Sequence, residues 1–322
     1  MSEVRQRIVV GIDGSEGARG ALTWALTQAA QRGADLEVLS AFPVDFYWVD
    51  PYLLDSGRID AIRSQTEIRA QAMLDEVRQD PAIVALAGAA AVDVQILVVG
   101  GAPAAHLVQR SEDAALLVVG SRGRGGLRST VAGSVALHCS AHAKCPVVVV
   151  HPTTAPAEEP ARVVVGLDDS QPARAALAAA VEMAAPLGAR VDAVVAYEAP
   201  NYWIDLYAVM PPPIGETQPH ARARSESIVA EVVGAEALER GAVRVVAVEG
   251  HPGQVLVREA EGARLLVVGS RSRNQLEGVV LGTVALHCVM HAPCPVLVVP
   301  EPADRSPEST VQATAGAGLT VG

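Results

Sequence analysis

Glycine, serine and arginine residues are spaced in one short segment in a way that could bind a phosphate group. Gly120 is followed after two residues by Gly123, after nine more by Gly133, and then by Ser134. Glycines let the backbone approach a ligand closely and expose N–H groups that bind anions. A serine at the start of a following helix would add a hydroxyl and a favourable helix dipole. Three arginines supply positive charge within the segment: Arg122, Arg124 and Arg128.

The same segment occurs a second time, over residues 269–288, with altered chemistry. Four positions there have the same or a similar residue as in the first copy: Gly269, Arg271, Gly282 and Thr283. The second glycine of the motif is lost, because Ser272 stands where the first copy has Gly123. If that position needs a positive φ, serine costs about 1–2 kcal/mol, although Asn274 could provide the bend one step later. We therefore predict a second site that binds the same ligand more weakly.

The repeated segment belongs to a duplication of a whole domain. RIVVGIDGSEGARGAL, which begins at Arg7, pairs with RVVVGLDDSQPARAAL, which begins at Arg162. A linker rich in proline, alanine and glutamate separates the copies, and the last residues lack periodic large apolar side chains, which favours a disordered tail. The predicted division is a first domain over 1–151, a linker over 152–161, a second domain over 162–300 and a tail over 301–322.

Alternating strands and helices must position these segments in each copy. The apolar runs are continuous in valine, leucine and isoleucine, which is typical of parallel strands buried on both faces. In the first copy we expect strands at IVVGID, LEVLSAF, VDVQILVV, ALLVVGS and CPVVVV. We expect helices over 16–31, 59–86 with a break near Pro81, 103–112 and 130–142. The second copy repeats the pattern, so we predict two tandem, doubly wound α/β domains.

In a sheet of this kind, ligands bind beyond the carboxyl ends of the strands. Asp13 ends the first strand, where its carboxylate could accept hydrogen bonds from a ribose hydroxyl or a base amino group. Asp13 or Ser15 could instead cap the following helix. Gly101 and Pro103 follow the third strand, where proline suits an ordinary helix start. The glycine-rich segment follows the fourth strand, so all of these features gather at one edge of the sheet.

Composition excludes several classes of protein. The chain has 322 residues, a formal net charge of -11 and no basic run, which argues against nucleic acid or a membrane surface as a partner. No apolar stretch is long enough for a transmembrane helix, and the first residues enter a strand with no signal peptide, so we expect a cytoplasmic location. Lys144 is the only lysine and GxxxxGK[ST] is absent, which excludes a Walker-type NTPase.

Three motifs, in this order, resemble the universal stress protein family: VVGIDGS, G-x2-G-x9-G-[ST] after the fourth strand, and HAKCPVVVV. The tandem arrangement is similar to two-domain members common in actinobacteria. The resemblance implies, in each copy, a five-stranded parallel sheet of order 3-2-1-4-5 with helices on both faces. It also implies ATP, with Mg2+, as the ligand, a homodimer, an unknown regulatory protein partner, and a role in stress or growth arrest rather than catalysis.

The resemblance and the alignment of the two copies assign candidate nucleotide-binding residues. Asp13 would contact the adenosine, the backbone around Ala41 the adenine, and the glycine-rich segment the ribose and phosphates. The candidates in the first copy are Gly11, Asp13, Ser15, Ala41, Gly101, Gly120, Ser121, Arg122, Gly123, Arg124, Gly133, Ser134 and Val135. Those in the second copy are Gly166, Asp168, Ser170, Ala196, Gly250, Gly269, Ser270, Arg271, Ser272, Arg273, Gly282, Thr283 and Val284.

Other functions are compatible with the same residues. A slow ATPase or another adenine-nucleotide enzyme would need a positioned base, and the first loop holds no histidine or carboxylate. Cyclic AMP is an alternative ligand, although the complete first loop suits a polyphosphate better. Zinc could bind a repeated histidine and cysteine pattern, where the resemblance instead implies an ordinary last helix and strand. That pattern comprises His138, Cys139, His142 and Cys145, with His287, Cys288, His291 and Cys294 in the second copy.

Aromatic residues are concentrated in two further stretches, over 42–52 and 197–207. Each stretch follows the second strand of its copy, on the ligand side of the sheet. Aromatic side chains gathered in a loop favour a contact surface. We expect them either to wall the adenine side, to form a contact between copies or protomers, or to cover the core of their own domain.

Overall fold

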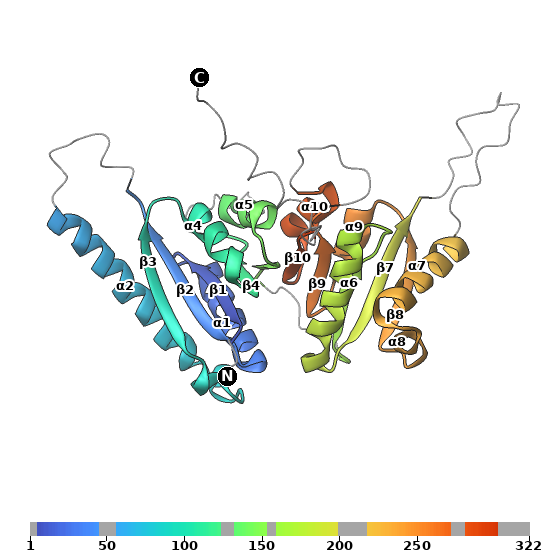
Figure 1. The fold of residues 1–322 in the computed structure, drawn as a ribbon, viewed down its shortest axis with the longest axis horizontal. Helices are drawn as coiled ribbons and strands as arrows, with labels where there is room; N and C mark the ends of the chain where they lie inside the picture. The colour runs from blue at the N-terminus through green and yellow to red at the C-terminus, as the bar shows by residue number, and fades with distance from the viewer. Residues whose placement is uncertain are drawn as a thin grey trace, which may run out of the picture.

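The two copies form one continuous sheet. The computed structural model describes residues 5–44, 56–123, 132–152, 159–198, 218–271 and 281–301. Its strands form a single 10-stranded sheet of order β3-β2-β1-β4-β5-β10-β9-β6-β7-β8. Figure 1 shows the two copies on either side of the central β5–β10 pair. The predicted order 3-2-1-4-5 is confirmed within each copy, while the joining of the two sheets was not predicted.

The first copy alternates strands and helices as its apolar runs predict. Its strands are β1 (Arg7–Ile12), β2 (Asp35–Phe42), β3 (Val94–Gly100), β4 (Leu116–Gly120) and β5 (Val147–Val150). Its helices are α1 (Glu16–Arg32), α2 (Ser56–Arg78), α3 (Pro81–Val84), α4 (Pro103–Arg110) and α5 (Ser134–His142), with 3-10 turns η3 (Ala89–Ala91) and η4 (Ser111–Asp113). The expected break near Pro81 is confirmed, because Pro81 begins α3 with Asp80 as its N-cap.

The second copy repeats this order. Its strands are β6 (Arg162–Gly166), β7 (Arg190–Tyr197), β8 (Val243–Glu249), β9 (Leu265–Gly269) and β10 (Val296–Val299). Its helices are α6 (Gln171–Ala184), α7 (Gln218–Val233), α8 (Ala235–Glu239), α9 (Pro252–Glu259) and α10 (Thr283–His291), with a 3-10 turn η5 (Ala185–Leu187). The two copies therefore present equivalent scaffolds for their candidate sites.

The start of one helix differs from the sequence prediction. The last helix of the first copy begins at Ser134 rather than near Thr130, because Gly133 has an extended backbone and serves as N-cap. Ser15 caps α1 by accepting a hydrogen bond from the Ala18 N–H. Asp13 is therefore not the N-cap of α1. It lies two residues before the N-cap, Ser15. The helix ends as predicted at Gly33, which has a left-handed φ of 62°.

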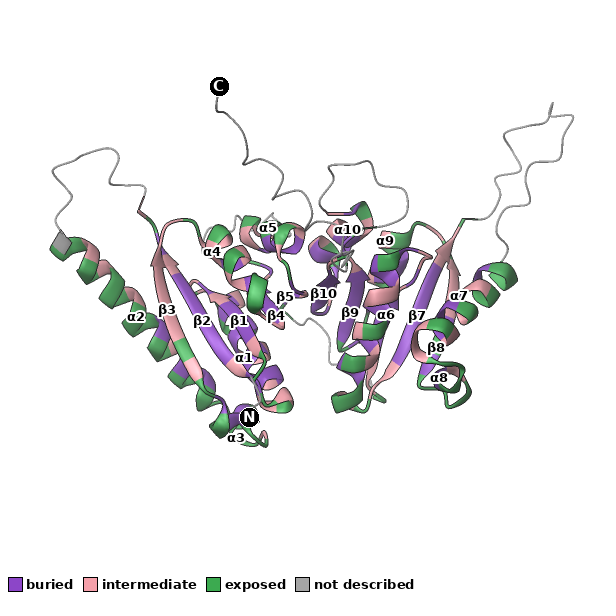
Figure 2. Cartoon of the chain, viewed as in Figure 1, coloured by how far each residue is buried: buried purple, intermediate pink, exposed green. Residues whose placement is uncertain are grey.

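The β5–β10 pair joins the copies through short aliphatic strands. The two strands are antiparallel, with Val149 opposite Val296 and Val147 opposite Val298. Their side chains alternate between two hydrophobic cores, one beneath helices α1, α2, α6 and α7 and the other beneath α4, α5, α9 and α10. Burial of both faces explains the unbroken valine runs. Figure 2 shows buried strands covered by helices whose outer residues are exposed.

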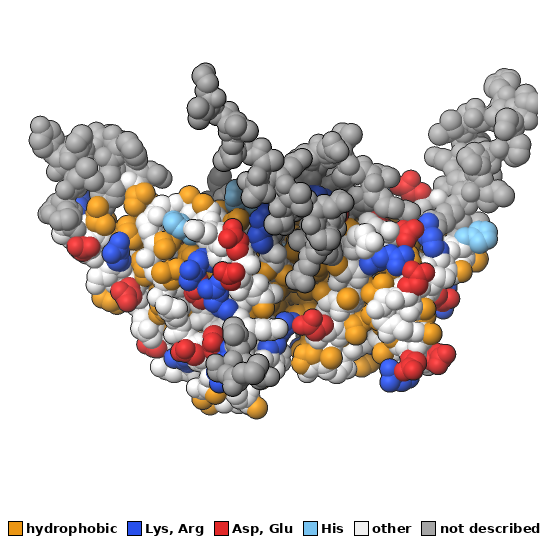
Figure 3. Space-filling view, viewed as in Figure 1, with side chains coloured by type: hydrophobic (Ala, Val, Ile, Leu, Met, Phe, Trp, Pro, Cys, Tyr) orange, Lys and Arg blue, Asp and Glu red, His pale blue; other side chains and the backbone are white. Residues whose placement is uncertain are grey.

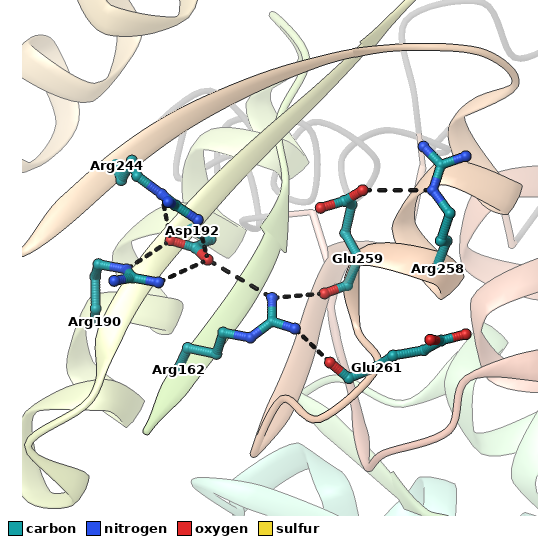
Figure 4. A network of polar contacts seen from close by, with 7 residues as sticks. All are labelled: Arg162, Arg190, Asp192, Arg244, Arg258, Glu259 and Glu261. Carbon is teal, nitrogen blue, oxygen red and sulfur yellow. Dashed lines mark hydrogen bonds and ion pairs between the residues drawn. The ribbon is translucent and has the colours of Figure 1, made fainter. Parts of the chain in front are cut away.

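Buried carboxylates are neutralised by arginines near the amino ends of the strands. Glu37 in β2 is 2% exposed and accepts hydrogen bonds from Arg110 and Arg7. In the second copy, Asp192 accepts from Arg190 at 2.9 Å and from Arg244 at 3.0 Å, as Figure 4 shows. A buried charge is tolerated only when it is paired in this way. These clusters lie at the opposite edge of the sheet from the candidate sites.

The described charges are mixed over the surface. In Figure 3 the arginine, aspartate and glutamate side chains on the visible face are interspersed rather than separated by sign. None of the described helices is long and apolar enough to cross a membrane. The structure thus offers charge pairs rather than a broad basic area on this face.

His151 ties the end of β5 to the second copy. Its imidazole is buried, with 8% exposure, and its Nε2 lies 2.8 Å from the carbonyl oxygen of Val289 in α10. The Nε2–H group therefore donates to this carbonyl, while Nδ1 has no hydrogen-bond partner in the described structure. Burial lowers the pKa of His151, and the charge of nearby Arg122 lowers it further. Folding therefore favours the neutral form of this side chain.

We predict that His151 makes stability fall in mild acid. An unfolded histidine has a pKa of about 6.5. Because the folded pKa is lower, the unfolded state binds more protons below that pH, and the free energy of unfolding decreases as pH falls. His151→Gln keeps a donor for the Val289 carbonyl but does not titrate. Urea unfolding between pH 8 and 5 should show a smaller loss for the variant; equal losses would contradict this role.

Candidate functional site

A cavity of about 600 Å³ lies at the carboxyl ends of β1, β2 and β4. Nine of the predicted binding residues of the first copy line it: Gly11, Asp13, Ala41, Gly120, Arg122, Gly123, Gly133, Ser134 and Val135. They come from segments up to 124 residues apart in the chain (from Gly11 to Val135), and the parallel sheet brings them together. The volume falls in the range of small-molecule sites, which is about 300–1,000 Å³.

One wall of this cavity is apolar and was not predicted. It includes Leu39 of β2, Leu107 of α4 and Val119 of β4, with Ile12, Ala18, Pro43, Pro103, Ala132 and Ala136 also among the lining residues. Leu39 and Val119 occupy inward positions at the carboxyl ends of their strands, so their place within the Val/Leu runs could have identified them. The described lining therefore combines apolar side chains with a carboxylate, an arginine and the start of a helix, a composition that suits a ligand with both apolar and charged parts.

The second motif glycine is required by a close approach to Asp13. A Cβ atom on Gly123 would lie 2.5 Å from Oδ2 of Asp13, which is closer than real Cβ atoms come to a neighbour. Gly123 does not have a positive φ, so a left-handed backbone is not the reason for glycine at this position in the first copy. Asp13 itself accepts a hydrogen bond from the Ser15 N–H at 2.9 Å through Oδ1. Glycine here leaves room for the carboxylate.

Other glycines of the motif allow tight packing within the protein. A Cβ on Gly17 in the first turn of α1 would lie 2.5 Å from the carbonyl oxygen of Arg122, and one on Gly120 would lie 2.7 Å from the Gly17 carbonyl oxygen. A Cβ on Gly11 would meet Leu107 at 2.8 Å. These contacts hold α1, α4 and the end of β4 close together. Gly11 and Gly120 therefore allow the close packing that shapes the cavity, independently of which ligand binds there.

The start of α5 forms the polar side of the cavity. The Gly133 N–H donates to the Ser121 carbonyl at 2.8 Å, and the Ser121 N–H donates to the Val150 carbonyl at 2.8 Å, which closes the base of the loop onto β5. Among the described residues, no side chain makes a capping hydrogen bond at the start of α5. The first N–H groups of a helix lack acceptors within it and carry partial positive charge. Ser134, Val135 and Ala136 line the cavity, so this helix end and Arg122 face the same space.

The second copy has a smaller cavity of about 250 Å³ at the equivalent edge. Seven predicted residues line it: Gly166, Asp168, Ala196, Gly269, Arg271, Gly282 and Val284. Its scaffold is the same, because a Cβ on Gly166 would meet Leu256 at 2.8 Å. Its polar groups differ. Asp168 accepts from both the N–H and the hydroxyl of Ser170, and Arg271 is paired with Glu301 at 3.0 Å.

Some predicted residues lie outside the two cavities. Ser15 and Ser170 are helix caps, and Gly101 and Gly250 take positive φ angles of 107° and 134° in the turns after β3 and β8. Ser121, Ser270 and Thr283 lie next to the linings but are not part of them. Arg124, Ser272 and Arg273 fall outside the described residues. Of the aromatic stretches, the described residues include Phe42, which is buried, and Tyr197, which packs against the core.

The histidine and cysteine pattern is split between the core and the surface. Cys139 and Cys288 are 0% exposed, and burial raises the pKa of each thiol to about 12. His138 and His142 are exposed. Within the described ranges no three histidine, cysteine or acidic side chains are grouped to hold a metal ion.

Two stretches of the chain match one family of known proteins. The model of the universal stress protein family matches residues 5–151 and again residues 160–300. The chain belongs to the universal stress protein family. The two matches confirm the resemblance to a tandem universal stress protein that the motif order indicated. The fold of the two copies confirms the predicted fold class.

Relatives of this universal stress protein span nearly its whole length. The universal stress protein Rv2623 of Mycobacterium tuberculosis is 31% identical over 299 residues, covering 91% of this chain and 96% of the relative. Rv2005c of the same species is 31% identical over 313 residues, covering 92% and 99%. A solved universal stress protein from Archaeoglobus fulgidus DSM 4304 shares the fold with a TM-score of 0.65, at 21% identity and coverage of 93% and 97%.

We predict opposite effects for alanine at two glycines of α1. Gly17→Ala places a methyl group against the Arg122 carbonyl, so the free energy of unfolding should fall by about 1–3 kcal/mol. A Cβ on Gly20 would meet only Val150, at 3.8 Å, which is an ordinary contact. Gly20→Ala should therefore raise stability by about 0.5–1 kcal/mol, because alanine loses less backbone entropy in a helix. Urea unfolding of both variants measures the difference, and equal stabilities would refute the packing role of Gly17.

Proposed function

We propose that this universal stress protein binds ATP in its first copy and acts as a regulatory protein in stress response or growth control. The observation that supports this most is the composition of the larger cavity, which is lined by apolar side chains together with a carboxylate, an arginine and a helix N-terminus. ATP has the same three parts: a flat base, a ribose with hydroxyl donors, and a chain of phosphates.

Each part of the cavity suits one part of the nucleotide. Leu39 and Leu107 provide apolar contact for the adenine beside the Ala41 backbone. Asp13 would accept hydrogen bonds from ribose hydroxyls, because its carboxylate lines the cavity beside Gly123. The N–H groups at the start of α5 and the guanidinium of Arg122 would neutralise phosphate charge. Mg2+ would be carried on the phosphate oxygens of the nucleotide.

Binding rather than turnover is the proposed activity. Phosphoryl transfer needs a group that positions water or accepts a proton, and the carboxylate lining this cavity, Asp13, lies on the adenosine side of the proposed pose. ATP would regulate by stabilising one conformation or assembly over another. A homodimer and a regulatory protein partner belong to the same proposal. Because β5 and β10 pair within one chain, a dimer would use another surface.

Replacing Gly123 tests the proposed site. In Gly123→Ala the methyl group meets the Asp13 carboxylate, so either the carboxylate turns or the loop moves, and ATP should bind at least about tenfold more weakly, or about 1.4 kcal/mol. Isothermal titration calorimetry with ATP measures the affinity, and Gly20→Ala is the control because it adds the same methyl group away from the cavity. ATP affinity that is unchanged in Gly123→Ala would overturn the assignment of this cavity.

Turnover is tested separately. We expect phosphate release from ATP by the purified chain to stay near the uncatalysed background. Steady-state release well above background, abolished by Gly123→Glu and retained after removal of the residues beyond Glu301, would replace the binding function by an ATPase in the same cavity.

A further inference from the structure

The arginine that faces the phosphate side of the cavity is already paired in the second copy. Arg271 lines the second cavity as Arg122 lines the first. Its guanidinium lies 3.0 Å from Oε2 of Glu301, which follows β10 by two residues. The corresponding position after β5 is Pro152, which has no charge. In the second copy, a carboxylate therefore pairs with the arginine that would otherwise be available to bind a phosphate.

A second carboxylate changes the same edge. Asp169 stands in place of Gly14, which has a φ of 82° in the first copy. Asp169 pairs with Arg174 at 3.1 Å, and Arg174 also pairs with Glu231 at 2.7 Å. The first copy has the equivalent arginine–glutamate pair, Arg19 with Glu76, without the additional acid. The second copy thus has two acids near this edge, Asp169 and Glu301, where the first copy has Gly14 and Pro152, and each acid is paired with an arginine.

The second copy retains the residues that would bind the nucleoside part of a nucleotide. Asp168 is fixed by two hydrogen bonds from Ser170, at 2.9 Å from the N–H and 2.5 Å from the hydroxyl. Ala196 and Leu256 line the cavity where Ala41 and Leu107 line the first. The volume, however, is about 250 Å³ against about 600 Å³ in the first copy. The lost space and the added negative charge both disfavour a triphosphate.

We propose that the second copy binds an adenine nucleoside without phosphates, and that Glu301 takes the place of a phosphate on Arg271. This proposal rests on the proposed function of the first copy. A nucleoside carries no charge, so it meets no repulsion from Asp169 or Glu301 and leaves the Arg271–Glu301 pair intact. A nucleotide would have to displace Glu301 from Arg271 before that arginine could pair with a phosphate. One chain would then bind ATP and a nucleoside at separate sites.

Calorimetry on the full chain tests the selectivity. In Gly123→Ala the first site is weakened, and titrations fitted with two sites should show adenosine binding the second site at least about tenfold more tightly than ATP. Glu301→Gln in this background should raise ATP affinity about fivefold, the value of one exposed ion pair, and leave adenosine affinity unchanged. Glu301→Gln with Asp169→Gly should raise it further. Glu159→Gln is the control, because Glu159 forms a similar exposed pair with Arg264 at 2.8 Å away from both cavities.

The outcomes separate this proposal from the one on which it rests. If the unaltered chain binds ATP at the first site and the second site binds ATP as tightly as adenosine, the nucleoside proposal is refuted and the proposed function stands. The same holds if Glu301→Gln changes ATP and adenosine affinity equally, or acts no more than Glu159→Gln. If no site binds ATP or adenosine, both proposals fail.

Discussion

The pairing of β5 with β10 is the interaction on which the rest of the structure depends. Each strand has four residues and a wholly aliphatic sequence, so neither could face water on either side. An unpaired edge of this kind would also expose backbone N–H and C=O groups that invite association with other chains. Because each strand covers the other, the two cores continue from one copy into the other, and the position of each copy is fixed by this junction.

Duplication has preserved the scaffold more strictly than the charges that face a ligand. The approach of Gly11 to Leu107 recurs as that of Gly166 to Leu256, with the same distance for an added Cβ. These contacts set the separation of strand and helix and leave no room for change. The charged positions around the cavities lie at the rim, where substitution costs little stability. Divergence between the two sites is therefore concentrated in Asp169, Glu301 and the loop that begins at Ser272.

Much of this fold follows from local sequence patterns, and the rest depends on contacts through space. Valine-rich runs predicted the strands, Gly33 the end of α1, and the motif order the topology of each copy. The β5–β10 pair could not be predicted, because the pattern of CPVVVV does not depend on whether the outer neighbour of this strand is a helix, a second chain or another copy. The reason for Gly123 required the position of Asp13, 110 residues earlier. Glu301 was assigned to the tail, because no local signal marks a partner as distant as Arg271.

The short connection between the copies favours pairing within one chain over pairing between chains. Residues 151–161 join β5 to β6 and keep both halves of the central pair on one chain. A connection of so few residues gives effective concentrations on the order of millimolar. Pairing within a chain therefore outcompetes pairing between chains at any ordinary protein concentration. Extending the connection would lower that advantage and allow β5 of one chain to exchange for that of another, turning a closed molecule into an open-ended polymer.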